Sequence, residues 1–255
     1  MIVKIKKTRE KPDRIIISTT QNNGSFSERT IFRVPYEMVV SCNESYVYLV
    51  TNEEEVKTLN ILGKLKNTLP GIGLRMKTGL TVDFRNREIL RNHAEENAIP
   101  LFYSQHIQNG KVIFPIGKEA EYIVTAQGGL RQANTNYLFV KRFTSKEEHR
   151  RLQCGIYLSR QYPEYTEIST QNKINFICGA KKLSECVVYG LYVLFNSTVY
   201  DCYYRMLNGS TQVNSTEING MPVPSINIIE AMGKDLIRIK DMSEEVCNNI
   251  LRSYL

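Results

Sequence analysis

A stretch of amide and hydroxyl side chains, Asn208–Asn214, follows an apolar helical pattern that ends at Leu207. Amide side chains can make paired hydrogen bonds with adenine, and hydroxyl groups can contact several bases. The same residue types also cap helices, so Asn208-Gly209 could end one helix and Asn214 or Ser215 could begin the next. Both roles are compatible, because a capped loop is rigid. The side chains that could read base edges are Asn208, Ser210, Thr211, Gln212 and Asn214.

Two other segments, residues 64–91 and 131–151, hold many more cations than carboxylates. Lys and Arg side chains that contact phosphates position a protein on DNA and make its binding depend on salt. Gly79 could let a phosphate approach the backbone beside Lys77, although a turn that enters a strand explains the same residues. For Lys141 and Arg142, a solvated strand end is the alternative. The candidate phosphate contacts are Arg75, Lys77, Thr78, Thr81 and Arg85 in the first segment and Lys141 and Arg142 in the second, where Arg131, Lys146, Arg150 and Arg151 add further cations.

The composition is that of an ordinary globular protein with a mild preference for anionic partners. Of 255 residues, 42% are hydrophobic and 23% charged, and the formal net charge is +7. The six cysteines form no Cys-x-x-Cys pair and there are three histidines, which argues against a bound metal. With no signal peptide and no apolar run of membrane-spanning length, we expect a soluble, cytoplasmic protein with reduced cysteines and no membrane contact.

The first 73 residues predict a small β segment and a linker helix. Ile2–Ile5 and Ile15–Ser18 are short β-branched runs, and the Pro12-Asp13 turn between them favours a hairpin. Asn52 can cap a helix whose first turn holds three glutamates and whose apolar face begins at Val56. That helix should end before the Pro70–Gly73 loop.

Residues 74–255 alternate between strands and helices, so the chain as a whole is predicted to be α+β. Asn109-Gly110 is a strong hairpin signal. Ser145–Glu148 has capping-box spacing, which predicts a following turn of helix. The remaining patterns predict strands at residues 137–143 and 174–178 and helices at residues 184–195, 197–207, 225–232 and 243–255.

Most catalytic motifs are missing from the sequence. It contains no phosphate-binding P-loop, no His-Glu-x-x-His and no Gly-x-Ser-x-Gly. Asp13 together with Glu55 and Lys57 could be forced into the pattern of a metal-dependent nuclease. However, Glu55 and Lys57 fit equally the solvated face of the predicted helix. His106 is expected to be a structural hydrogen-bonding residue, because no acidic or nucleophilic partner adjoins it in sequence.

Four segments together carry a family resemblance, in this order: residues 75–85 (Arg-Met-Lys-Thr-Gly-Leu-Thr-Val-Asp-Phe-Arg), residues 100–107, residues 136–143 and the Asn208–Asn214 stretch. They resemble the C-terminal half of the adenine-specific methyltransferases of BsuBI/PstI-type restriction-modification systems, which contains a TaqI-like target-recognition region. The resemblance covers about residues 30 to 230. It implies that residues 1–73 are the edge of a methyltransferase domain and its linker helix, and that residues 74–255 are a target-recognition domain.

The resemblance also implies what this chain binds and what it lacks. The family's Asn/Asp/Ser-Pro-Pro-Tyr/Phe motif is absent, since there is no Pro-Pro dipeptide, and so is a Phe-x-Gly-x-Gly cofactor motif. We therefore expect no catalytic residue and no bound cofactor here, with S-adenosylmethionine bound in the complete enzyme. The expected partners are duplex DNA and a catalytic methyltransferase domain, upstream in the same chain or in a separate subunit. The alternative is an interaction module, in which the helices between Ser184 and Leu207 pack on a partner protein and the polar stretch only caps them.

Overall fold

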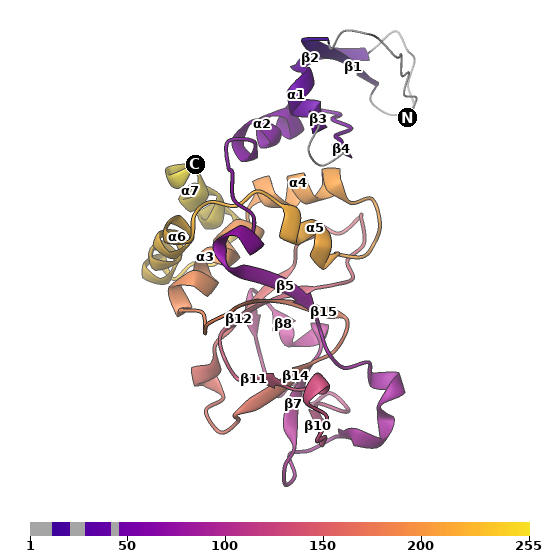
Figure 1. Cartoon of the computed structure of the whole chain (residues 1–255), viewed down its shortest axis with the longest axis vertical. Helices are drawn as coiled ribbons and strands as arrows, with labels where there is room; N and C mark the ends of the chain where they lie inside the picture. The colour runs from indigo at the N-terminus through magenta and orange to yellow at the C-terminus, as the bar shows by residue number, and fades with distance from the viewer. Residues whose placement is uncertain (1–11, 21–28, 42–45) are drawn as a thin grey trace. The chain divides into compact units, whose positions relative to one another are not determined.

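The computed structural model describes residues 12–20, 29–41 and 46–255, which form an α+β fold as predicted (Figure 1). The chain separates into two compact units, Met1–Lys64 and Leu65–Leu255. The sequence had suggested a boundary at residue 73, and the assignment of the two parts to a methyltransferase edge and a recognition domain stays a prediction. No helix in the described ranges is long and apolar enough to span a membrane.

The N-terminal unit contains a small β hairpin that includes the strand predicted at Ile15–Ser18. The predicted pairing of that strand with Ile2–Ile5 stays a prediction. Strand β1 (Arg14–Thr20) pairs antiparallel with β2 (Arg29–Pro35), so that Ile17 lies opposite Phe32. The strand predicted at Ile2–Ile5 lies outside the described residues. The other elements of this unit are α1 (Tyr36–Val39), β3 (Val40–Ser41), β4 (Tyr46–Val47) and α2 (Glu53–Leu62).

Helix α2 begins as its sequence predicts. The side chain of Asn52 accepts a hydrogen bond of 2.9 Å from the backbone N–H of Glu55, which satisfies one free donor of the first turn. Three glutamates in that turn lie at the positive end of the helix dipole. Leu59 and Leu62 of its predicted apolar face are buried.

The larger unit is built on two sheets with an aromatic core. Phe102 from one sheet packs edge-on against Phe139 and Tyr157 from the other, with ring centroids 5.6 and 5.1 Å apart, and all three rings are fully buried. One sheet has the order β5 (Leu74–Thr78), β15 (Ile174–Gly179), β12 (Tyr137–Lys141), β13 (Cys154–Tyr157), β9 (Lys111–Val112), β8 (Ile107–Gln108). The second has the order β11 (Gln132–Ala133), β14 (Glu167–Thr170), β7 (Ile99–Phe102), β10 (Tyr122–Ile123), β6 (Leu90–Arg91).

The predicted Asn109-Gly110 hairpin is present. Strands β8 and β9 pair antiparallel, and both turn residues have positive φ, 48° and 78°, as a type I′ turn requires. The predicted turn of helix after Ser145 is wrong: residues 146–147 form a simple turn. Only half of the capping box exists there, a 2.7 Å hydrogen bond from the Ser145 N–H to the Glu148 carboxylate.

Helices lie on one side of the six-stranded sheet and the second sheet lies on the other, as Figure 1 shows. Helix α3 packs against β12, β13 and α6, and two glycines, Gly190 and Gly233, lie where α3 meets α6. The four helices predicted from residue 184 onward are present, although α6 runs further than its sequence pattern indicated. They are α3 (Glu185–Phe195), α4 (Thr198–Leu207), α6 (Ile226–Ile239) and α7 (Glu244–Tyr254). A short helix, α5 (Ser215–Gly220), lies between α4 and α6.

Candidate nucleic-acid interface

The polar segment Asn208–Asn214, here called the polar loop, lies along the chain that leaves the end of β12. The backbone N–H of Val213 donates to the carbonyl of Arg142 at 2.7 Å, and that of Thr144 donates to the carbonyl of Thr211 at 3.0 Å. Between these bonds Phe143 and Gln212 form an antiparallel bridge. The polar loop is therefore held by strand-like backbone pairing and not by its caps alone.

A buried asparagine connects the polar loop to the other predicted segments. Asn175 of β15 donates its side-chain N–H to the carbonyl of Val213 at 2.7 Å, and its side-chain oxygen accepts from the Thr78 hydroxyl at 3.2 Å. Three segments far apart in sequence, around Thr78, Arg142 and Gln212, thus meet across strands β5, β15 and β12.

Asn208 serves the structure of the loop. Its side chain is 5% exposed, and its oxygen accepts from the N–H and the hydroxyl of Ser210 at 2.7 and 2.9 Å. Its side-chain N–H donates to the Gln212 carbonyl at 3.1 Å. It ends α4 in an extended conformation and not in the left-handed conformation typical of an Asn-Gly cap. Of the two roles predicted for Asn208, the structure supports the structural one.

Glu217, which was not among the predicted site residues, holds the polar loop in place through three side-chain contacts. Its carboxylate accepts from the Tyr204 hydroxyl at 3.0 Å, from the Asn214 amide at 3.3 Å and from the Asn208 amide. Burial raises the pKa of Tyr204, so this hydroxyl stays protonated and can donate. The capping-box spacing from Asn214 to Glu217 was the available signal, since Asn214 does precede α5.

The remaining polar-loop residues are at least partly exposed. Ser210 and Thr211 are exposed, and Gln212 and Asn214 are half-buried. None of these side chains is needed to fill the core, which contains Val213 from this loop. They remain candidates for contact with a ligand.

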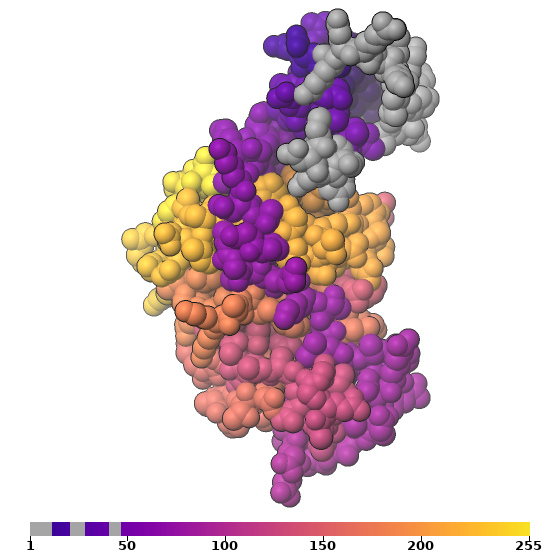
Figure 2. Space-filling model, viewed as in Figure 1, coloured from indigo at the N-terminus to yellow at the C-terminus, as the bar shows by residue number. Residues whose placement is uncertain are grey.

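The predicted phosphate contacts separate into different places. Arg75 and Lys77 are exposed on β5, an edge strand, where they alternate with buried Leu74 and Met76. In the space-filling view the purple stretch that leads into β5 runs across the visible face (Figure 2). Arg85 is also exposed, in a 3-10 turn beside the Phe84 ring.

Two other candidates lie elsewhere. Thr81 is fully buried, with its hydroxyl 2.7 Å from that of Ser169, so it is not available to a DNA phosphate. Lys141 lines a cleft of about 790 Å³ together with Arg150 and Gln153. No residue of the polar loop lines this cleft.

Two arginines of the second cationic segment are structural. Arg151 is 1% exposed, and its guanidinium donates to the Ser210 carbonyl at 2.6 Å and to the Thr144 hydroxyl at 3.1 Å. Arg150 donates to the carbonyls of Phe195 and Ser197 at the end of α3. Charge counting could not separate such buried cations from surface ones.

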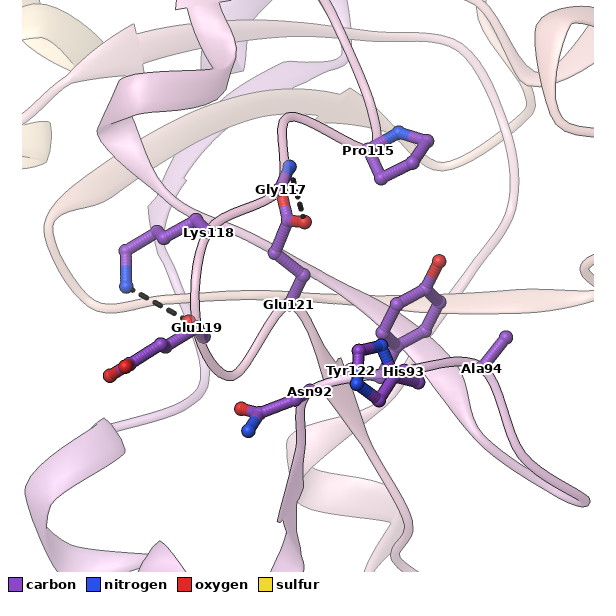
Figure 3. A pocket seen from close by; sticks show the side chains of 9 residues that line it. All are labelled: Asn92, His93, Ala94, Pro115, Gly117, Lys118, Glu119, Glu121 and Tyr122. Atoms are coloured by element: carbon purple, nitrogen blue, oxygen red, sulfur yellow. Dashed lines mark hydrogen bonds between the residues drawn. The ribbon is translucent and has the colours of Figure 1, made fainter.

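His106 is structural, as expected, although it does have an acidic partner. Its Nε2 lies 2.8 Å from the buried Glu121 carboxylate, which also accepts from the N–H groups of Ile116 and Gly117 at 2.9 and 3.0 Å. Burial lowers the pKa of His106, although the carboxylate acts in the opposite direction. Figure 3 shows Glu121 reaching toward Gly117 in a pocket of about 380 Å³. The network holds the chain at residues 115–121 in place.

Comparison with known proteins relates most of the chain to two enzymes. No family model matches. The chain is 36% identical over 211 residues to the type II methyltransferase M.PstI of Providencia stuartii, which covers 79% of this chain and 41% of that protein. It is 34% identical over 233 residues to the type II methyltransferase M.BsuBI of Bacillus subtilis, covering 88% of this chain and 45% of that protein.

Similarity to solved structures is weak. One match is a chain from a structure of a type I R-M system. The matched region covers 79% of this chain and 49% of that chain, with 8% sequence identity and a TM-score of 0.42. A second match is the HsdS subunit from Thermoanaerobacter tengcongensis. The matched region covers 80% of this chain and 46% of that subunit, with 9% sequence identity and a TM-score of 0.33. Scores this low support no conclusion about fold or function. The sequence matches do, and they confirm the resemblance: this chain is a homologue of the type II methyltransferases M.PstI and M.BsuBI, of which it spans less than half.

Proposed function

We propose that this chain recognises duplex DNA within a restriction-modification system. The observation that carries the proposal is the polar loop, whose exposed Ser210 and Thr211 and half-buried Gln212 are fixed by backbone pairing to residues 142–144. A loop that is ordered before binding loses less conformational entropy when it contacts DNA. Polar groups held at fixed positions on such a loop can discriminate between bases by hydrogen bonding. The homology to two type II methyltransferases supports the same role.

The exposed cations suit the non-specific part of such binding. Arg75, Lys77 and Arg85 are exposed. Lysine and arginine side chains at such positions neutralise phosphates and release counterions, which adds affinity without reading sequence. A neutral loop for the bases and separate cations for the backbone divide the two tasks between different residues.

The finer proposal assigns this chain to an adenine-specific, S-adenosylmethionine-dependent enzyme. In it the chain acts as the specificity part, and a catalytic methyltransferase domain, upstream in the same protein or in a separate subunit, binds the cofactor and the flipped adenine. The proposed location is the cytoplasm, where the DNA substrate of such a system lies.

The burial of α3 argues against this helix as the contact surface that the rival hypothesis of a protein-interaction module requires. That hypothesis needs α3 and α4 to offer apolar faces to a partner. The apolar residues of α3, from Val187 to Phe195, are already buried within this chain. Helix α4 likewise buries Tyr200 and Tyr204. Helix α3 therefore has no large apolar face left for another protein, while Val199, Met206 and Leu207 of α4 are half-buried.

The test is the salt dependence of binding to duplex DNA. We expect the 255-residue chain to bind a fluorescein-labelled duplex in an anisotropy titration. If three cations contact phosphates, affinity should fall about 40-fold between about 50 and 200 mM NaCl. Arg75→Gln with Lys77→Gln should make the logarithmic salt slope shallower by about 1.8.

The matched control removes the same charge elsewhere. Lys234→Gln with Arg238→Gln changes two exposed residues of α6 that pair with carboxylates on their own helix. This control should leave the salt slope unchanged. No binding at low salt, or an affinity independent of salt, would contradict the proposed function.

A further inference from the structure

The side chains of Gln212 and Arg142 are joined by two hydrogen bonds. In the amide orientation that satisfies its neighbours, the Gln212 side-chain oxygen accepts from Arg142 Nε at 3.2 Å and from Arg142 Nη2 at 2.7 Å. The Gln212 side-chain nitrogen donates to the Asn214 side-chain oxygen at 3.3 Å. The opposite orientation would place acceptor against acceptor and donor against donor, so the network selects this one.

These contacts use most of the hydrogen-bonding capacity of the Gln212 amide. An amide oxygen has two lone pairs, and Arg142 occupies both. The nitrogen carries two hydrogens, of which Asn214 takes one. Among the residues that the structure describes, the other hydrogen has no acceptor. The half-buried Gln212 is thus left with one free N–H and no free acceptor.

Both partners of Gln212 are themselves held in place. Arg142 donates through Nη1 to the carbonyl of Asn172 at 3.0 Å, and its guanidinium lies 5.6 Å from the Phe143 ring centroid. The Asn214 amide donates to Glu217, which is fixed by Tyr204. A continuous set of contacts from Glu217 to Asn172 therefore fixes the direction of the Gln212 amide.

We propose that Gln212 reads DNA as a hydrogen-bond donor only, and that Arg142 is the positioning residue that makes it so. This inference rests on the proposed function of DNA recognition. The base edge that Gln212 selects would carry an acceptor, such as N7 or O6 of guanine, N7 of adenine or O4 of thymine. The paired contact of glutamine with adenine is excluded, since it also needs the amide oxygen. Arg142, predicted above as a phosphate contact, acts through Gln212 instead.

The first test changes the hydrogen-bonding character of Gln212 while keeping its shape. The 255-residue chain is equilibrated with a pool of duplexes with a randomised core, and the bound fraction is sequenced. In Gln212→Glu, the carboxylate still accepts from Arg142 but has no N–H. At one position of the preferred sequence, the acceptor-bearing base should lose about five- to tenfold in enrichment. Cytosine, which presents an amino group and no acceptor at this edge, should gain.

The second test separates positioning from phosphate contact. Arg142→Lys keeps the charge but removes the two-pronged donor, so the Gln212 amide can turn and use its oxygen. We expect the base preference at the same position to broaden toward adenine. The affinity for duplexes that lack the preferred sequence should stay within about twofold of that of the original chain. An equal loss of affinity for all sequences with an unchanged preference would show that Arg142 contacts a phosphate, and would overturn its positioning role.

The control variant is Gln127→Glu, which makes the same chemical change at an exposed residue outside the polar loop. It should leave the preferred sequence unchanged. If the original chain selects a sequence and Gln212→Glu selects the same one at every position, the donor role of Gln212 is wrong while the proposed function stands. If the original chain binds no duplex or selects no sequence, the proposed function itself fails, and this inference fails with it.

Discussion

At the residue scale, buried or half-buried charged groups in this protein hold loops in place. Glu121 accepts three N–H bonds and Glu217 fixes three side chains, while Arg151 donates to a carbonyl and a hydroxyl. Removing a charge from water is unfavourable unless hydrogen bonds replace those to water. In each case the replacing bonds connect a loop to the core. These residues should therefore matter for the stability of the chain and only indirectly for any ligand.

His106 provides a prediction about pH. Its pKa in the folded chain is lowered, so the unfolded chain takes up a proton at a higher pH than the folded chain does. The stabilisation by neutral His106 is complete above its ordinary pKa of 6.5 and is lost as pH falls below that value toward the folded pKa. The free energy of unfolding should fall in this window with a slope approaching about 1.4 kcal/mol per pH unit.

The measurement is urea unfolding between about pH 7.5 and about pH 5.5. His106→Gln removes the titrating group and should flatten this part of the profile. His93→Gln, a change at an exposed histidine, is the control and should keep the slope. An equal slope in the original chain and in His106→Gln would mean that another group causes it.

At the element scale, helices α3 and α6 pack closely at two glycines. A Cβ atom on Gly190 would lie 1.8 Å from the Ile229 carbonyl oxygen, and one on Gly233 would lie 1.7 Å from that of Cys186. Backbone oxygens cannot move aside without moving the helix. Gly190→Ala or Gly233→Ala should therefore lower the free energy of unfolding by about 1–3 kcal/mol or more.

Urea unfolding of both variants tests this, with Gly220→Ala as the matched control. Gly220 ends α5, and a Cβ there would meet no atom within 4 Å. That change should be neutral or stabilise by up to about 1 kcal/mol, since alanine restricts the unfolded chain. Unfolding curves of the Gly233 variant that match those of the original chain would contradict the close packing of the two helices.

Elements with local signals were predictable from the sequence, and their pairing was not. Helices α2, α3, α4 and α7 each begin after an Asn or Ser side chain that accepts from the first turn, as the sequence indicated. The Asn109-Gly110 turn was equally local. By contrast, the pairing of β1 with β2 and the order of the larger sheets depend on contacts between residues far apart in sequence. No local pattern encodes such contacts.

The same distinction between local signals and long-range contacts applies to the candidate site. Residue type and spacing identified the polar loop and the exposed cations of β5. They could not show that Phe143 and Gln212 pair, because these residues are far apart in sequence. Nor could they show that Thr81 and Arg151 are buried while Arg75 is exposed, because burial depends on the whole fold. The pairing changes the interpretation of Arg142, from a free cation to a partner of Gln212.

At the scale of the whole molecule, this chain should bind DNA and leave its bases unmodified. It spans 41% and 45% of the two methyltransferases that it matches. Its sequence has no Pro-Pro dipeptide to bind a flipped adenine and no Phe-x-Gly-x-Gly to bind a methionine-derived cofactor. We therefore expect the purified 255-residue chain to transfer no methyl group to DNA and to bind S-adenosylmethionine no more than a protein without a cofactor site.

The assay is transfer of tritium from labelled S-adenosylmethionine to a mixed-sequence DNA, with calorimetry for cofactor binding and M.PstI as the positive control. Methyl transfer needs the reacting base outside the duplex and beside the cofactor's methyl group, so a chain that holds only the duplex cannot supply it. DNA binding without methyl transfer would separate recognition from catalysis. Methyl transfer by the pure chain would show that it contains an active site that its sequence motifs do not reveal, and would contradict its assignment as a specificity part.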